Sequence, residues 1–201
     1  MMMILQVKLL PQYLADLGYE SHMIGKWHLG HHRQEYTPTH RGFNSHFGFW
    51  TGKEDYFSHV SAEEVQGEYR SGYDLRRNMS VSWAEKGDYI TDVFTKEAER
   101  LITKHSEESD APVFLYLSHL AVHAGNEYSP LQAPRDAVER HAHIEDERRR
   151  VFGGMLERLD QSVGRVTSAL SRTGMLEVKT ECVRHVLIAL YPGQCHHLLH
   201  R

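Results

Sequence analysis

The stretch YESHMIGKWHLG, residues 19–30, joins a short apolar segment to a loop bracketed by two glycines. Residues 19–24 predict a β-strand, and Gly25 and Gly30 permit tight turns at both ends of the loop that carries Lys26 and His28. Ahead of this stretch, leucines and Tyr13 recur at helical spacing and predict a helix over residues 8–17. The sequence therefore places a cation and an imidazole at the carboxyl end of a strand.

Further helices and strands follow in alternation. The apolar positions between Ile90 and Ile102 have the three-four spacing of an amphipathic helix, and a longer stripe of this kind runs from Phe152 to Leu170. The continuous apolar run at residues 113–117 is typical of a parallel strand covered on both faces, and another strand is predicted around residues 186–190. This order predicts an α/β fold with a mostly parallel sheet and flanking helices.

Two intervening regions lack this pattern. Residues 31–87 are rich in glycine, serine, aromatic and charged residues, and predict loops and short edge elements. Residues 135–150 hold ten charges of both signs among sixteen positions, which is typical of a solvated helix face or surface loop.

Composition excludes several classes of protein. The 201 residues correspond to one domain or a piece of a larger one, with 40% hydrophobic and 25% charged residues. A net charge of -4 gives no basic field for nucleic acid or anionic lipid, and no apolar run is long enough for a membrane span. The first residues, MMMILQVK, lack the pattern of a signal peptide.

Three polar residues follow the predicted strands. In open α/β sheets ligands bind beyond the carboxyl ends of strands, where Lys26, His28 and His123 are expected. These three residues are the catalytic candidates, and Lys26 and His28, two apart, could turn one cation and one proton-transfer group toward a common small anion. Two simpler interpretations stay open. The loop at residues 25–30 could be an ordinary turn in which Trp27 packs and the polar groups face water, and His123 could have a structural role only.

Other polar groups are weaker candidates. The 16 histidines invite a metal interpretation, but none of the sets formed by His28, His31 and His32, by His141 and His143, or by His196, His197 and His200 has zinc-site spacing. No metal ligand is therefore assigned. The pair Glu54-Asp55 is expected to cap or solvate a turn. Residues 78–80, NMS, match a glycosylation acceptor at Asn78.

Several short motifs that follow one another in a fixed order are more specific than any of these residues alone. They are GKWHLG at 25–30, TPTHRGF at 37–43, FGF at 47–49, EDYFSH at 54–59, FLYL at 114–117, AVH at 121–123 and PLQAP at 130–134. With these motifs in order, residues 9–175 resemble the middle of a sulfatase catalytic domain, above all the group of arylsulfatases B, I and J. Residues 124–129 look like an insertion in that pattern.

The resemblance implies a fold, a reaction and roles. It implies an alkaline-phosphatase-like fold and hydrolysis of a sulfate ester, with a formylglycine nucleophile and bound calcium. Lys26 would hold the sulfate and the aldehyde hydrate, His28 would hydrogen-bond that hydrate and help to expel sulfate, and His123 would lie at the leaving oxygen, so Lys26 and His123 would bind substrate. It further implies a sulfated small molecule or glycosaminoglycan sugar as substrate, and a lysosomal or secreted location in which Asn78 could carry a glycan.

The sequence departs from the sulfatase pattern in its nucleophile segment and in its calcium ligands. The 201 residues hold no Cys-x-Pro-Ser-Arg segment, since neither Cys182 nor Cys195 has the required neighbours, and the family's paired calcium ligands are absent. We therefore expect residues 1–176 to form a partial N-terminal catalytic domain, incomplete at both ends, and residues 177–201 to form a divergent tail of unassigned structure. As this polypeptide alone, the chain is expected to be a truncated, inactive fragment. The alternatives are a non-catalytic interaction protein that displays residues 135–150 and a histidine-based metal binder.

Overall fold

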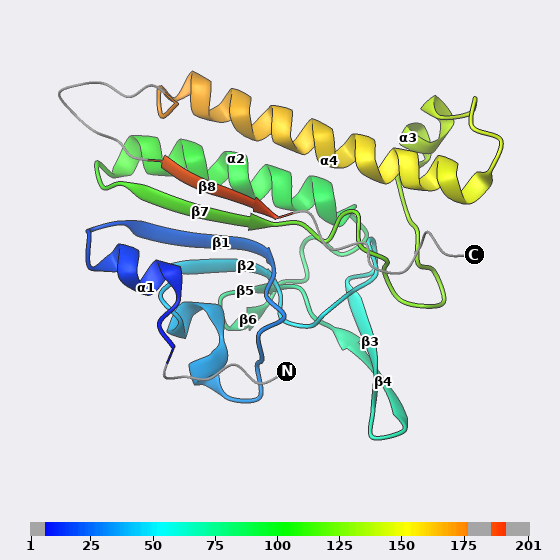
Figure 1. Cartoon of the computed structure of the whole chain (residues 1–201), viewed down its shortest axis with the longest axis horizontal. Helices are drawn as coiled ribbons and strands as arrows, with labels where there is room; N and C mark the ends of the chain where they lie inside the picture. The colour runs from blue at the N-terminus through cyan, green and yellow to red at the C-terminus, as the bar shows by residue number, and fades with distance from the viewer. Residues whose placement is uncertain (1–6, 177–185, 192–201) are drawn as a thin grey trace.

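A computed structural model describes residues 7–176 and 186–191 of the chain (Figure 1). The elements are α1 (Leu10–Ala15), β1 (Glu20–Lys26), η1 (Gln34–Tyr36), η2 (Pro38–His40), β2 (Ser45–Phe49), β3 (Val60–Val65), β4 (Glu68–Tyr73), β5 (Arg76–Arg77), β6 (Ser80–Val81), α2 (Ile90–Glu108), β7 (Val113–Ser118), α3 (Arg135–Arg140), α4 (Glu147–Arg172) and β8 (Val186–Tyr191). None of the helices in these ranges is long and apolar enough to cross a membrane.

The main sheet has the strand order β6-β5-β2-β1-β7-β8. β1 pairs in parallel with β2 and with β7, and β7 pairs in parallel with β8, whereas β5 and β6 add short antiparallel pairs at one edge. β3 and β4 form a separate antiparallel hairpin, which extends from the carboxyl ends of the strands in Figure 1. The predicted α/β class with a mostly parallel sheet is confirmed.

Helices cover the sheet on both faces, and the side chains of β1 alternate between them. Ile24 packs with α2 and α4 in the larger apolar cluster, whereas its neighbour Met23 packs with Leu14 of α1 in the smaller one. The same alternation separates Leu115 from Phe114 on β7. Both faces of the central strands are therefore buried, which explains their nearly continuous apolar sequences.

The predicted helices and strands are present with adjusted bounds. α2 extends beyond Ile102 to Glu108, and α4 begins at Glu147, so the charged residues before Phe152 form its solvated first turns. α1 is shorter than predicted, because Leu10–Ala15 is helical and the chain then turns through Gly18 at φ 81°. The strand predicted around residues 186–190 is β8, whereas the rest of the tail lies outside the described residues.

One part of the prediction for residues 31–87 is wrong. β2 is an inner strand of the sheet rather than an edge element or a loop. It escapes pattern analysis because it has five residues and carries Gly48 in its middle. That glycine is required by packing, since a Cβ at this position would lie 2.0 Å from the carbonyl oxygen of Gly25 on β1.

Candidate active site

Lys26, His28 and His123 lie beyond the carboxyl ends of two adjacent parallel strands. Lys26 is the last residue of β1, His28 follows it in the loop, and His123 lies in the turn after β7. The turn that holds His123 is closed by a hydrogen bond from its backbone amide to the carbonyl of Leu120, at 2.8 Å. We name this end of the sheet the carboxyl edge.

The loop after β1 is fixed by the end of β2. The amide of Trp27 donates to the carbonyl of Phe49 at 2.9 Å, and the amide of His28 donates to the carbonyl of Trp50 at 3.1 Å. The buried indole of Trp27 also donates to the carbonyls of Gly30 and Tyr36. His28 itself has φ 51°, a left-handed conformation that side chains rarely adopt and that clusters at functional sites.

Lys26 is a half-buried cation without an anionic partner among residues 7–176 and 186–191. Burial lowers the pKa of its ammonium from the usual value. Burial is also the main cause of the lowered pKa of His28, and the charge of Lys26 lowers it further. The pKa of His123 is lowered in the same way, by burial, with a contribution from Lys26. The three groups therefore lie within Coulombic range of one another, and the charge of Lys26, together with two imidazoles that can donate hydrogen bonds, favours a bound anion.

The tautomer and position of His123 are set by its neighbours. Its Nδ1 lies 2.6 Å from the carbonyl oxygen of Ala124, which can only accept, so Nδ1 carries the proton. The buried Tyr56 hydroxyl donates to the backbone carbonyl of His123 at 2.7 Å. The remaining ring nitrogen, Nε2, is the atom of His123 that can exchange a proton or bond with a bound molecule.

Further residues at this edge were not among the sequence candidates. Lys53 contributes to the lowered pKa of His123, and Glu63 acts in the opposite direction on the pKa of His28. Gly52 packs against the imidazole of His28, because a Cβ at this position would lie 2.8 Å from its Nε2. Recognition of β2 as an inner strand would have drawn attention to Gly52 and Lys53, which follow its carboxyl end.

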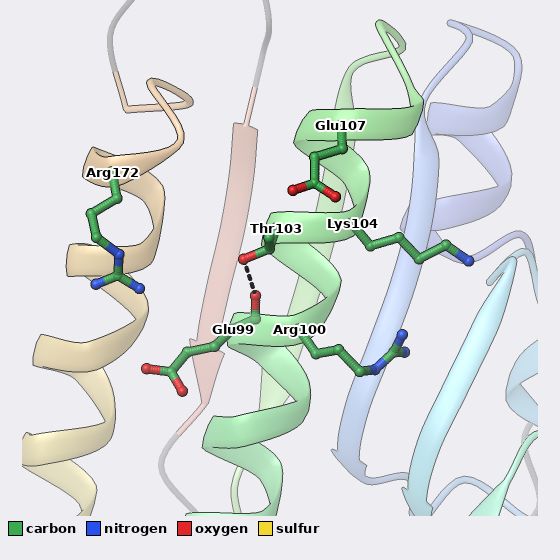
Figure 2. A pocket seen from close by; sticks show the side chains of 6 residues that line it. All are labelled: Glu99, Arg100, Thr103, Lys104, Glu107 and Arg172. Atoms are coloured by element: carbon green, nitrogen blue, oxygen red, sulfur yellow. Dashed lines mark hydrogen bonds between the residues drawn. The ribbon is translucent and has the colours of Figure 1, made fainter.

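A hollow of about 240 Å³ adjoins the carboxyl edge. Its lining includes His31, Thr51, Glu63, Arg70 and Arg76, from the loops and the β3–β4 hairpin. A larger hollow of about 440 Å³ lies at the other end of the molecule, between α2 and α4 (Figure 2). Six residues line it, namely Glu99, Arg100, Thr103, Lys104, Glu107 and Arg172. Since these are helix-surface side chains far from the candidate residues, the larger hollow is not the candidate site.

The pair Glu54-Asp55 divides into two roles. Asp55 caps a turn as predicted, since its Oδ1 accepts from the amides of Phe57 and Ser58 at 3.0 and 2.8 Å. Glu54 is fully buried instead of solvated, and neither of its carboxyl oxygens has a hydrogen-bond partner among the residues that the structure describes. Burial raises its pKa well above the usual value, and the charges of Asp74 and Asp55 add to the effect.

The described residues do not fit a calcium site at the carboxyl edge. Over residues 7–176 and 186–191, the one cluster of three or more potential metal ligands is Glu20, His22 and His105, at the opposite end of β1. His31 and His32 instead pack against Trp50 and Tyr36. Cys182, Cys195 and the tail histidines lie outside the described residues. No calcium-dependent or formylglycine-dependent step is therefore derived for these residues.

Asn78 lies at the exposed turn between β5 and β6, with φ 55°. Its Oδ1 accepts from the amide of His46 at 2.9 Å. That bond uses the side-chain oxygen and leaves Nδ2, the atom to which a glycan attaches, at the surface.

Sequence comparisons define the family. The sulfatase family model matches residues 5–178. Arylsulfatase J from Mus musculus is 39% identical over 166 residues, which are 82% of this chain and 26% of that protein. N-acetylgalactosamine-6-sulfatase from Mus musculus is 30% identical over 176 residues, 83% of this chain and 30% of that protein. The chain belongs to the sulfatase family, and it spans about a quarter to a third of the length of these relatives.

Solved structures share the fold. The crystal structure of Ps i-CgsB in complex with k-i-k-neocarrahexaose superposes with a TM-score of 0.74 at 24% identity, covering 94% of this chain and 40% of that one. The PsFucS1 sulfatase from Pseudoalteromonas sp. gives a TM-score of 0.56 at 20% identity, with 90% and 36% covered. The predicted alkaline-phosphatase-like fold of sulfatases is thereby confirmed.

Proposed function

We propose that this chain contributes the sulfate-recognition part of a sulfatase active site, built from Lys26, His28 and His123. The observation that carries this proposal is the half-buried ammonium of Lys26, which has no carboxylate partner in the described part of the chain and whose charge reaches both imidazoles. A half-buried cation flanked by two hydrogen-bonding imidazoles is stabilised when a sulfate ester brings negative charge to it.

Each side chain has a role that suits its chemistry. Lys26 binds the sulfate oxygens as a compact charge. His28 donates a hydrogen bond to the sulfate group from the loop, and its ring orientation depends on Gly52. His123 lies with Nε2 at the leaving oxygen, where its fixed tautomer allows this nitrogen to hold or transfer a proton. One preorganised donor at such a position is worth roughly 3 kcal/mol of transition-state stabilisation.

The finer assignments rest on resemblance to arylsulfatases and N-acetylgalactosamine-6-sulfatase. The proposed substrate is a sulfated amino sugar of a glycosaminoglycan. The proposed location is lysosomal or secreted, with a glycan on Asn78. Residues 1–176 are proposed as part of the catalytic domain, with residues 177–201 as a divergent tail.

As a polypeptide of 201 residues, the chain is proposed to bind sulfate esters without hydrolysing them. It has no cysteine in the Cys-x-Pro-Ser-Arg setting, so a covalent sulfate-transfer step has no nucleophile to begin from. Hydrolysis of an aryl sulfate by the purified chain with calcium present, abolished in His123→Ala, would contradict this part of the proposal.

Calorimetric titration tests recognition itself. N-acetylgalactosamine 6-sulfate and the unsulfated sugar are titrated into the wild-type chain, Lys26→Ala and the control Lys104→Ala, which removes a lysine of the distant hollow. We expect the sulfated sugar alone to bind, with at least a tenfold loss in Lys26→Ala and no loss in the control, since one charge-assisted hydrogen bond contributes about 1.5–3 kcal/mol. Equal binding by both lysine variants would refute the proposal.

The charged region at residues 135–150 gives no comparable support to an interaction protein. Arg140 bonds Asp136 at 3.0 Å and Glu157 at 2.7 Å, and Arg135 bonds Glu139 at 2.7 Å. Because these charges are neutralised within the helices, they leave little net field for a partner.

A further inference from the structure

A second cluster of polar residues lies at the amino-terminal end of the parallel strands, which we name the amino edge. Glu20 and His22 begin β1, and His105 lies in the last turn of α2. Glu20, His22 and Ile24 alternate with Met23 and therefore face α2. His105 continues the buried stripe of α2 formed by Ala98, Leu101 and Ile102.

The ligand atoms of the three residues converge. Nδ1 of His105 lies 3.4 Å from Oε2 of Glu20, Nε2 of His22 lies 3.9 Å from the same oxygen, and all three atoms are within 4.8 Å of one another. Tetrahedral zinc with bonds of about 2.0–2.1 Å needs ligand atoms about 3.4 Å apart. Small side-chain movements thus bring these atoms to coordination distance.

Each ligand is oriented by a second partner through its other polar atom. Nε2 of His105 lies 2.9 Å from the carbonyl of Ala111, and Nδ1 of His22 lies 2.8 Å from Oγ of Ser45. Oε1 of Glu20 accepts from the hydroxyl of Ser109 at 2.8 Å. Hydrogen bonds of this kind to the outer atoms of histidine and carboxylate ligands are the usual support of protein metal sites.

The hydrogen bond of His105 to Ala111 decides which of its ring nitrogens can bind a metal. Because the Ala111 carbonyl can only accept, Nε2 of His105 carries the proton, and neutral His105 presents a lone pair at Nδ1. In the neutral ring that lone pair faces the carboxylate oxygen of Glu20 at 3.4 Å, which sets two acceptors against each other. A cation between them removes the repulsion and uses both lone pairs.

Surrounding charges define what kind of cation fits. Lys104 and Arg100 lie within Coulombic range of His22 and oppose added positive charge, although Lys104 pairs with Glu108 and Arg100 with Glu97. Figure 2 shows both side chains reaching away from α4, on the side where β1 lies. The negative end of the α2 dipole acts in favour of a cation. A metal that bonds imidazole strongly is therefore required, which favours zinc over calcium or magnesium.

We propose that Glu20, His22 and His105 bind one zinc ion and thereby tie the carboxyl end of α2 to the first strand. Three protein ligands leave a fourth position open, and the side chain of Glu20, which is 41% exposed beside 15% for His22 and 5% for His105, places that position toward solvent. This site is separate from Lys26, since the four steps of extended strand from His22 to Lys26 span about 13 Å.

Zinc titration of the metal-free chain tests this proposal, with binding followed by calorimetry and thermal unfolding. Three variants each remove one ligand atom and keep its supporting hydrogen bond: His22→Asn keeps the contact to Ser45, His105→Gln keeps the contact to Ala111, and Glu20→Gln keeps the contact to Ser109. The control is His143→Asn, an exposed histidine outside the cluster. Circular dichroism establishes that each variant is folded.

The wild-type chain is expected to bind one zinc equivalent that each ligand variant loses or binds at least tenfold more weakly, with a zinc-dependent rise in Tm that disappears in the same variants. Cobalt in place of zinc should give visible d–d bands in the wild type and the control alone. Zinc uptake that the three variants leave unchanged, or a wild-type chain that binds no zinc, would overturn the proposal and leave a protonated His105 as the partner of Glu20.

Discussion

The two edges of the parallel sheet use the same residue types for opposite purposes. At the carboxyl edge, Lys26 and two imidazoles lie within range of one another, and no carboxylate of residues 7–176 or 186–191 pairs with the lysine. At the amino edge, two imidazoles meet the carboxylate of Glu20, and each has its outer atom fixed by a hydrogen bond. The contrast teaches that a histidine's partners decide its chemistry: we propose an anion site where the imidazoles flank an unpaired lysine, and a metal site where they meet a carboxylate.

The largest expected effect comes from Gly25, which joins the carboxyl edge to the neighbouring strand. A Cβ at this position would lie 1.9 Å from the carbonyl oxygen of Ser118, and Gly25 has φ 109°. We expect Gly25→Ala to lower the free energy of unfolding by at least about 4 kcal/mol, because backbone must move. Urea unfolding measures the loss.

Gly18→Ala is the matched control for this substitution. Gly18 also has positive φ, at 81°, but has open space around the Cβ position. Gly18→Ala should lower the free energy of unfolding by about 1 kcal/mol, which is the cost of placing alanine at positive φ without a steric clash. Equal losses at the two positions would show that the close approach of β1 and β7 at the carboxyl edge does not constrain the fold.

The next largest effect is a loss of folding stability at acid pH, caused by two buried imidazoles close to the carboxyl edge. Burial lowers the pKa of His46, which bonds the Gly25 carbonyl, and of His119, which follows β7, to about 4 in each case. Between pH 6.5 and about 4 the unfolded chain binds more protons than the folded chain, so stability falls as the pH falls through this window. Each histidine contributes at most about 3 kcal/mol to that loss.

Thermal unfolding at a series of pH values measures this effect. His46→Gln and His119→Gln keep an N–H donor near the position of Nε2 and remove the titrating group, so both should flatten the profile between pH 6.5 and 4. A profile as steep as that of the wild type would assign the acid sensitivity to other groups.

A smaller effect is expected at Gly52, beneath the imidazole of His28. Gly52→Ala places a methyl group within 2.8 Å of the ring nitrogen and must displace the ring rather than the fold. We expect sulfate-ester binding to weaken about threefold to tenfold, or about 1 kcal/mol, while zinc binding at the amino edge stays unchanged. Unchanged sulfate binding would remove His28 from the proposed site.

The smallest effect is a gain in stability at Glu54, the buried carboxyl near the loop of the carboxyl edge. Because its folded pKa is raised, the group costs stability that grows as the pH rises above the ordinary value of 4.5. Glu54→Gln should raise Tm slightly, and more at pH 8 than at pH 5. A loss of Tm at both pH values would instead indicate that an ionised Glu54 is stabilised by His59, whose Nδ1 lies 4.0 Å away.

The parts of the fold that sequence could predict are those with local signals. β7 is a continuous apolar run, α2 and α4 have clear helical stripes, and Lys26 and His28 follow a strand between glycines. β2 had no such signal, because its glycine serves a contact with β1 that only the assembled sheet creates. Without β2, the proximity of Lys53 to His123 could not be inferred.

The amino-edge cluster was missed for a related reason. His22 lies in a predicted strand and His105 on the buried stripe of a predicted helix, and each alone indicates only an ordinary structural histidine. Their meeting depends on the register between β1 and the end of α2, which no local spacing encodes. Local spacing instead draws attention to the closely spaced histidines, and in the described part of the chain those do not form a metal cluster.

Nuclear magnetic resonance of the histidine rings during a sulfate titration tests the central claim, that Lys26, His28 and His123 form one anion site. The account predicts that the ring signals of His28 and His123 shift together with a single affinity, that those of His22 and His105 do not move, and that Lys26→Ala abolishes both shifts whereas Lys104→Ala preserves them. Independent affinities for His28 and His123, or shifts that persist in Lys26→Ala, would contradict it.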